Sequence, residues 1–152
     1  MPADVRVASA DDCDELGRLL HAFNTEYDDI TPGPEALASR MRVLLEAGDT
    51  VALLAGDSPD GAAVLRFRPA IWVDADECYL AELYVTPEQR GHGLGKALLA
   101  AVIDTARARG CAWIDLDTGE DDLAARHLYE SFGFINREGP GGPISYAYEL
   151  EL

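Results

Sequence analysis

The sequence predicts an α/β (α+β) fold with a mixed central sheet, formed by a single domain over residues 1–152. Its length suits one domain with a substantial hydrophobic core. Apolar residues recur at helical spacing in several segments, and shorter apolar runs bounded by turn residues predict strands between them. Because no repeat, low-complexity tract or linker interrupts these segments, we expect them to share one core.

The N-terminal third is predicted to contain a short strand and two helices. Val5–Val7 is the strand, and residues 9–12 resemble a capping box at the start of the first helix. The polar, proline-containing residues 24–34 are predicted to form a loop, and Gly48 suits the end of the second helix. The apolar positions that mark the two helices are Leu16, Leu19, Leu20 and Phe23, followed by Leu37, Met41, Leu44 and Leu45.

Three strands and a long helix are predicted next. Residues 51–55, 63–72 and 78–85 form an antiparallel meander, in which Pro69 interrupts the second strand. The apolar stripe over residues 94–109 predicts an amphipathic helix that Gly110 stops.

The C-terminal part is predicted to contain three further strands and one helix. Residues 112–116 form a strand, and a second capping-box pattern at 118–121 begins a helix that runs to about Phe132. Gly133 and Phe134 are expected to turn into a short strand. Residues 144–152 alternate apolar and polar side chains, a period of two that predicts a final half-buried strand.

Composition excludes several classes of protein. The net charge is −16, from 12 basic and 28 acidic residues, and such a surface repels nucleic acid and anionic membranes. No apolar run is long enough to span a membrane, and the N-terminus lacks the pattern of a secretory signal. Three widely spaced cysteines predict free thiols in the cytoplasm, with no disulfide framework and no metal site. The negative charge would suit a cationic substrate.

The most informative segment is residues 90–95, Arg-Gly-His-Gly-Leu-Gly, between a predicted strand and a predicted helix. This order brings several backbone N–H groups to one point, where the helix dipole adds partial positive charge. Glycine at 91, 93 and 95 lets an anion approach the amides closely. Arg90 and Lys96 add full positive charges, so we expect a phosphate site.

Two common phosphate-binding motifs do not fit this segment. A P-loop needs four residues between its glycines and a Ser or Thr after the lysine, but here the spacing is shorter and Ala97 follows Lys96. A dinucleotide-binding fold needs Gly-x-Gly-x-x-Gly at the start of a βαβ unit, whereas an antiparallel meander precedes this turn. Asp115 lies where the ribose-binding acid would be, but one acidic residue is weak support.

A third pattern, Arg90, Gly93 and Gly95, resembles motif A of the Gcn5-related N-acetyltransferase (GNAT) superfamily, and the resemblance extends over residues 83–99. Residues 125–134 are similar to motif B of the same family. The resemblance implies a mixed, mostly antiparallel central sheet flanked by helices. It also implies an enzyme that moves acetyl from acetyl-CoA to a primary amine by direct attack in a ternary complex.

The resemblance also implies roles for individual residues. Tyr129 would protonate or hydrogen-bond the leaving thiolate of coenzyme A, and the Leu83 N–H would polarise the thioester carbonyl. Asp122 stands where the family often has asparagine, and capping of its helix accounts for it equally well. The full set of residues expected to contact the cofactor is Leu83, Tyr84, Val85, Arg90, Gly91, His92, Gly93, Leu94, Gly95, Lys96, Asp122 and Tyr129.

The acceptor amine needs a base and a binding site. Glu82 lies on the strand beside the expected thioester and is our candidate for the base, with Asp115 and Asp117 as weaker alternatives. The acceptor pocket would include Glu26, Tyr27, Asp28 and Asp29, whose negative charges suit an ammonium group.

Two alternatives remain open at this point. A non-catalytic acyl-CoA sensor on the same fold would keep residues 90–95 but would need neither Tyr129 nor Glu82. A dinucleotide-binding oxidoreductase would bind NAD(P) instead of coenzyme A. The sequence does not identify the acceptor, and the alternating C-terminal strand could take part in a homodimer.

Overall fold

The computed structural model describes residues 4–152, which form two compact units, residues 4–116 and residues 117–152. Residues 1–3, part of the N-terminus for which no secretory signal is predicted, lie outside the described chain. The elements of the first unit are β1 (Val5–Val7), the 3₁₀ helix η1 (Ala10–Asp12), α1 (Cys13–Glu26), α2 (Pro34–Ala47), β2 (Thr50–Ala55), β3 (Gly61–Pro69), β4 (Asp76–Val85), the 3₁₀ helix η2 (Pro87–Gln89), α3 (Leu94–Ala108) and β5 (Ile114–Asp115). The second unit contains α4 (Leu123–Ser131).

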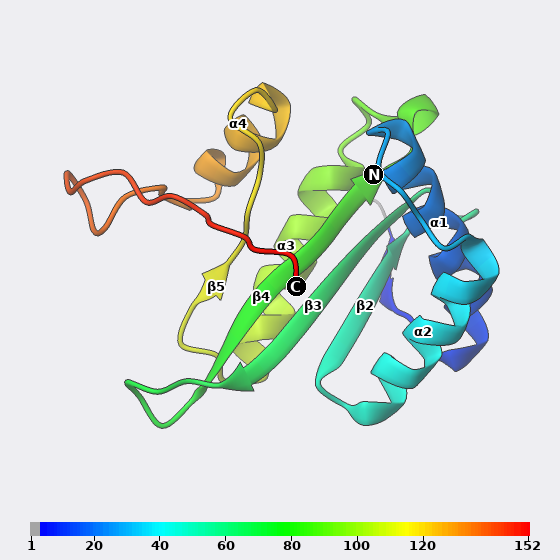
Figure 1. The fold of residues 1–152 in the computed structure, drawn as a ribbon, viewed down its shortest axis with the longest axis horizontal. Coiled ribbons are helices and arrows are strands. Elements are labelled where there is room, and N and C mark those ends of the chain that lie inside the picture. Colours follow the sequence, from blue (N-terminus) through cyan, green and yellow to red (C-terminus); the bar gives the residue numbers. More distant parts are fainter. Residues whose placement is uncertain (1–3) are drawn as a thin grey trace. The chain divides into compact units, whose positions relative to one another are not determined.

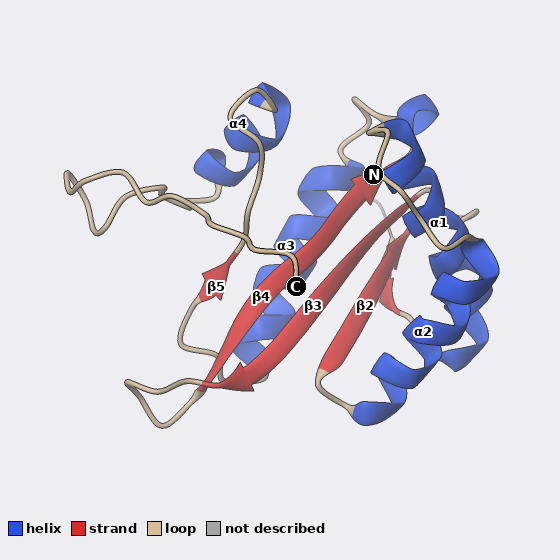
Figure 2. Ribbon diagram, viewed as in Figure 1, coloured by secondary structure: helices blue, strands red, loops and turns tan. Residues whose placement is uncertain are grey.

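The first unit is a sheet covered by helices on both faces. The strands lie in the order β1-β2-β3-β4-β5, with antiparallel pairing from β1 to β4 and parallel pairing between β4 and β5. Helices α1 and α2 cover one face and α3 covers the other (Figure 1 and Figure 2). The predicted mixed, mostly antiparallel sheet flanked by helices is therefore confirmed.

A β-bulge in β4 decides which side chains face α1 and α2. Leu80 lies opposite Leu65 and Glu82 lies opposite Val64, so Ala81 is the extra residue. Residues directly opposite each other in an antiparallel pair share a face. Val64 belongs to the core beneath α1 and α2. In a regular strand, residues two apart share a face. The bulge breaks this rule: Glu82 shares the face of Val64, toward α1 and α2, whereas Leu80 shares the opposite face with Leu65.

The start of the first helical segment is held by its predicted cap. Asp12 accepts a hydrogen bond of 2.8 Å from the Ser9 N–H and pairs with Arg6 at 2.8 Å. The Arg6 guanidinium, helped by the Ser9 N–H, holds the pKa of Asp12 well below its usual range. The first turn is the 3₁₀ helix η1, and α1 continues from it.

Three predicted boundaries in the first unit are wrong. Helix α1 continues to Glu26, so the loop does not begin at residue 24. Strand β3 ends at Pro69, which cannot donate to the sheet, and Trp72 is exposed in the hairpin beyond it. Only Ile114 and Asp115 of residues 112–116 form a strand, because β4 pairs with β5 at just two positions.

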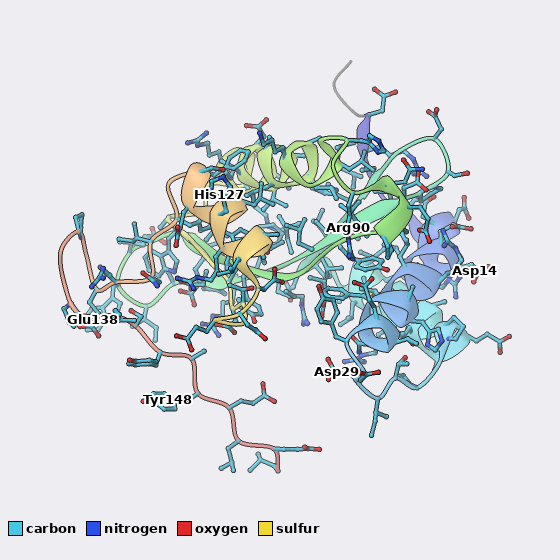
Figure 3. The ribbon with its side chains drawn as sticks, turned by 90° about the horizontal axis from the view of Figure 1, so that it is seen from above. Asp14, Asp29, Arg90, His127, Glu138 and Tyr148 are labelled. Carbon is cyan, nitrogen blue, oxygen red and sulfur yellow. The ribbon has the colours of Figure 1, made fainter. Side chains whose placement is uncertain are left out.

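The second unit differs more from the prediction. Helix α4 is capped by Asp122 rather than by the pattern at 118–121. Neither Gly133–Phe134 nor residues 144–152 form a strand, and within the described residues of this unit the strand-like pairing is a single bridge between Arg137 and Ile144. Tyr148 is 93% exposed, and Figure 3 shows it on an extended segment. A period of two shows which side chains would share a face of a strand. A strand forms only when a neighbouring strand pairs with it, and the alternation does not predict such a partner.

The contact between α1 and α2 depends on Gly17. A Cβ at this position would lie 2.3 Å from the Pro34 carbonyl oxygen and 2.8 Å from the Ala38 nitrogen. Both of these atoms belong to the backbone, so they cannot move aside cheaply. The close approach of the two helices therefore requires a glycine here.

We predict that Gly17→Ala lowers the free energy of unfolding by about 2 kcal/mol, because the methyl group would push the helices apart. The intrinsic helix preference of alanine acts in the opposite direction. Urea denaturation measures the change, with the exposed Ser39→Ala in α2 as a control expected to stay within about 0.5 kcal/mol. Equal stability of Gly17→Ala and the native protein would contradict the close packing.

Candidate functional site

Strand β4 is paired on both sides only near its beginning. Its pairing with β5 involves Cys78 and Tyr79, whereas its pairing with β3 continues to Val85. Beyond Tyr79, no pairing with β5 is found among the described residues. Leu83 and Val85 lie in this singly paired part, opposite Ala63 and Gly61. Backbone groups here could pair with an extended ligand in the way that a strand would.

The glycine turn follows β4 and leads directly into α3. Gly91 and Gly93 have φ angles of 82° and 84°, in the left-handed region that favours glycine. Gly91, His92, Gly93 and Lys96 are exposed. The first helical hydrogen bond recorded here runs from the Ala97 N–H to the Gly93 carbonyl, at 3.0 Å.

The amides of this turn are donors without acceptors. In the part of the chain that the structure describes, none of the N–H groups from Gly91 to Lys96 has a backbone or side-chain acceptor. The first N–H groups of any helix lack intrahelical partners, and such groups attract anions. A Cβ at Gly91 or Gly93 would meet no atom of the chain within 4 Å, so the space over the turn is open.

The guanidinium of Arg90 is bonded to other parts of the protein. Its Nε donates to the Val85 carbonyl at 3.0 Å, and its Nη2 lies 2.9 and 2.8 Å from the two carboxylate oxygens of Glu26. Sequence reasoning placed Arg90 with the cofactor and Glu26 with the acceptor, and it did not foresee that they pair. Figure 3 shows Arg90 on the turn after β4.

Tyr84 and Phe23 complete this contact. The Tyr84 hydroxyl donates to Glu26 Oε1 at 3.1 Å, and its ring stacks on Phe23 with centroids 4.8 Å apart. Tyr84 is buried, and burial together with the Glu26 hydrogen bond raises its pKa. Sequence reasoning missed this cluster, although Phe23 and Glu26 are three residues apart and hence on one side of α1.

Glu82 is a carboxyl group whose proton affinity is increased by burial. The bulge puts it on the same face as Tyr84, and burial raises the pKa of its carboxyl group. A raised pKa makes a carboxylate a stronger proton acceptor than one on the surface. The position of Glu82 in the sequence did not reveal that its pKa is raised.

The predicted acceptor residues after α1 adopt a tight turn. Asp28 has a φ of 57°, and the Asp29 N–H donates to the Asn24 carbonyl at 2.8 Å. Both carboxylates are exposed. The ring of Tyr27 packs edge-on against Phe23 at 5.4 Å. Figure 3 labels Asp29 in the connection that leads to α2.

In the second unit, Asp122 is the N-cap residue of α4 and Tyr129 lies seven residues further on, within the helix. The Asp122 carboxylate accepts from the Ala125 N–H at 3.1 Å, so its role as a helix cap is observed. Burial, with a smaller contribution from the Asp122 charge, raises the pKa of Tyr129 to about 12. Its ring packs edge-on against Phe134 at 5.9 Å. Tyr129 therefore keeps its proton throughout the neutral range.

Metal-binding clusters and membrane-spanning helices are both absent from the described residues. Across residues 4–152 there is no group of three His, Cys, Asp or Glu residues that could hold a metal ion. The same residues include no helix of the length and apolarity needed to cross a membrane. Cys13, Cys78 and Cys111 are free thiols, and burial raises the pKa of Cys78 to about 12.

Comparison with solved structures supports the fold as a whole. A crystal structure from Arthrobacter sp. FB24, assigned as an acetyltransferase, is 45% identical and has a TM-score of 0.88. The match covers 97% of this chain and 96% of that one.

Curated relatives match over shorter stretches. The mycothiol acetyltransferase of Beutenbergia cavernae is 34% identical over 84 residues, which are 53% of this chain and 27% of that protein. The [ribosomal protein bS18]-alanine N-acetyltransferase of Escherichia coli K12 is 42% identical over 59 residues, 39% of this chain and 40% of that protein. The chain thus spans less than half the length of these relatives. Residues 14–134 match the acetyltransferase (GNAT) family profile, and the protein belongs to that family.

Proposed function

We propose that this protein is an acetyl-CoA-dependent N-acetyltransferase that acetylates a primary amine on a small cationic molecule. The observation that carries the proposal is the row of N–H donors without acceptors from Gly91 to Lys96, at the start of α3. A diphosphate is a ligand for which such a row is suited. Membership of the family gives that diphosphate a source, coenzyme A.

The residues of the turn fit the cofactor. Acetyl-CoA would supply the acetyl group and a thiolate leaving group when bound. The amides of residues 91–96 would hold its diphosphate, and the open space over Gly91 and Gly93 allows close approach. The main chain of Leu83, Tyr84 and Val85 lies where β5 no longer pairs with β4, so it would hold the pantetheine arm and the thioester.

Two side chains would assist the transfer, one as a proton acceptor and one as a hydrogen-bond donor. Glu82 would accept the proton that the acceptor amine loses, directly or through a water molecule. Tyr129 would donate a hydrogen bond to the leaving thiolate. Because its pKa of about 12 lies above the usual thiol value of about 8.5, hydrogen bonding suits it better than complete proton transfer. Asp122, which caps α4, would keep Tyr129 in place.

The acceptor is proposed to be cationic because acidic residues surround its expected entrance. Asp28 and Asp29 are exposed after α1 and carry negative charges that suit an ammonium group. Relatives named for mycothiol and for a ribosomal protein suggest that acceptors differ widely within this family. We also propose that the chain is a cytoplasmic single domain that forms a homodimer through residues 144–152, where Tyr146 and Tyr148 are exposed.

An amine-panel assay tests the proposed function. The protein is incubated with acetyl-CoA and, separately, a polyamine, an aminoglycoside, free lysine and a peptide with N-terminal alanine, and products are identified by mass spectrometry. We expect acetylation of the polyamine or the aminoglycoside in preference to the peptide. Binding of coenzyme A without turnover of any amine would instead indicate an acyl-CoA sensor.

We predict that Gly93→Glu lowers the affinity for coenzyme A at least about tenfold, because the carboxylate would lie among the amides meant for phosphate. Gly110→Glu is the matched control: its φ of 80° is close to the 84° of Gly93, and its Cβ also meets nothing within 4 Å. Titration calorimetry measures both. Equal affinities of the two variants would contradict binding of the diphosphate at the turn.

We predict that Glu82→Gln lowers kcat/KM at least about a hundredfold, because the amide cannot accept the proton. In the native enzyme Glu82 acts when ionised, so the rate should fall as the pH drops through its pKa, which burial raises above the usual value of about 4.3. Initial rates across pH 4.5–9 would show an acid limb that the variant lacks. The same limb in Glu82→Gln would exclude Glu82 as its source.

We predict that Tyr129→Phe lowers kcat about tenfold or more and leaves the affinity for coenzyme A unchanged, because only the hydroxyl hydrogen bond is lost. The edge-on ring contact with Phe134 would survive the change. Steady-state kinetics and calorimetry separate the two quantities, with Tyr148→Phe in the exposed segment as the control. Native turnover in Tyr129→Phe would leave this residue a packing role only.

A further inference from the structure

Glu26, Arg90 and Tyr84 join three segments that are far apart in the sequence. Glu26 is the last residue of α1, Tyr84 lies near the end of β4, and Arg90 directly precedes the glycine turn. The Glu26 carboxylate accepts from the Arg90 Nη2 at 2.8 Å and from the Tyr84 hydroxyl at 3.1 Å. The contact therefore fixes the end of α1 against the strand and the turn.

The hydrogen bonds of the Arg90 side chain are made to Val85 and Glu26, outside the glycine turn. Its Nε is bonded to the Val85 carbonyl, its Nη2 reaches both carboxylate oxygens, and its guanidinium carbon lies 5.8 Å from the centroid of the Tyr84 ring. Hydrogen bonds between a guanidinium and a carboxylate are among the stronger ones in proteins. Binding a phosphate with this side chain would require breaking them.

The Glu26 carboxylate already accepts hydrogen bonds from the Arg90 guanidinium and the Tyr84 hydroxyl. An ammonium group bound to its carboxylate would compete with a full positive charge and with a hydroxyl donor from a buried tyrosine. Asp28 and Asp29 follow within three residues and are exposed. They are free of the contacts to Arg90 and Tyr84 that occupy Glu26, so they are better placed to meet an amine.

We infer that Glu26 is a positioning residue, which through Arg90 and Tyr84 fixes Tyr27, Asp28 and Asp29 beside the glycine turn. We call the contact of Glu26 with Arg90 and Tyr84 the tie. In this arrangement the Arg90 side chain has a structural role, and phosphate is bound only by the main chain of the turn. The inference rests on the proposed function only for the identity of the two ligands, which are coenzyme A at the glycine turn and an amine at Asp28 and Asp29. The tie itself is a property of the ligand-free chain.

A double-mutant cycle with hydrogen exchange tests the tie. Glu26→Gln keeps an acceptor for Tyr84 but removes the charge, Arg90→Gln removes the partner, and the third variant carries both changes. The readout is exchange of the Tyr27, Asp28 and Asp29 amides, which donate to carbonyls of α1. Glu15→Gln is the matched control, because Glu15 pairs with Arg18 at 2.7 Å on the exposed side of the same helix.

We expect about tenfold faster exchange at residues 27–29 in each single variant, with no additional increase in the double variant, because each change breaks the same contact. Exchange in the rest of the first unit and in Glu15→Gln should stay native. An effect confined to residues 27–29 and caused by a change at residue 90 is what a tie requires, whereas a general loss of stability would speed exchange throughout the first unit.

Titration with coenzyme A then separates the tie from direct phosphate binding. The tie predicts that Arg90→Gln and Glu26→Gln change the dissociation constant by less than about threefold and to the same extent. A tenfold loss in Arg90→Gln that Glu26→Gln does not share would overturn the inference, as would native exchange at residues 27–29 in both. Absence of coenzyme A binding in the native protein would refute the proposed function, while the exchange cycle would still decide the tie.

Discussion

Backbone N–H groups must find acceptors, and at the start of α3 the chain itself provides none. The donors from Gly91 to Lys96 point out of a turn whose two left-handed glycines leave no side chain in the way. Leaving such donors exposed is tolerable in water, but an anion satisfies them better and adds the favourable interaction with the helix dipole. Most of the groups that we propose to react lie on the strand that leads into this turn.

Strand β4 carries most of those groups because its two edges are used differently. The edge toward β3 is paired along its length, which fixes the strand, while the edge toward β5 is paired only at Cys78 and Tyr79. The bulge at Ala81 then turns Glu82 and Tyr84 toward the α1 and α2 face. A rigid strand with one open edge can thus offer main-chain groups to a ligand and side chains to a neighbouring helix.

The sequence predicted what depends on local patterns and missed what depends on long-range partners. Helical periodicity located α1, α2 and α3, and the local sequence also predicted the order of strand, glycine turn and helix from β4 to α3. The bulge at Ala81 could not be foreseen, because a register shift depends on the facing strand. The pair of Arg90 with Glu26 joins residues that share no local pattern. Residues 144–152 alternate correctly but lack a neighbouring strand in the second unit.

Net charge is a poor guide to the acceptor for a related reason. The value of −16 counts Glu26 and Asp12, but Arg90 and Arg6 already neutralise these carboxylates locally. The exposed charges elsewhere are screened over roughly 8 Å at physiological ionic strength. On the proposed function, the field that an approaching amine meets would be set by a few exposed carboxylates, above all Asp28 and Asp29. Selection of the acceptor would then depend on contact with these residues, because attraction by the surface as a whole does not distinguish one amine from another.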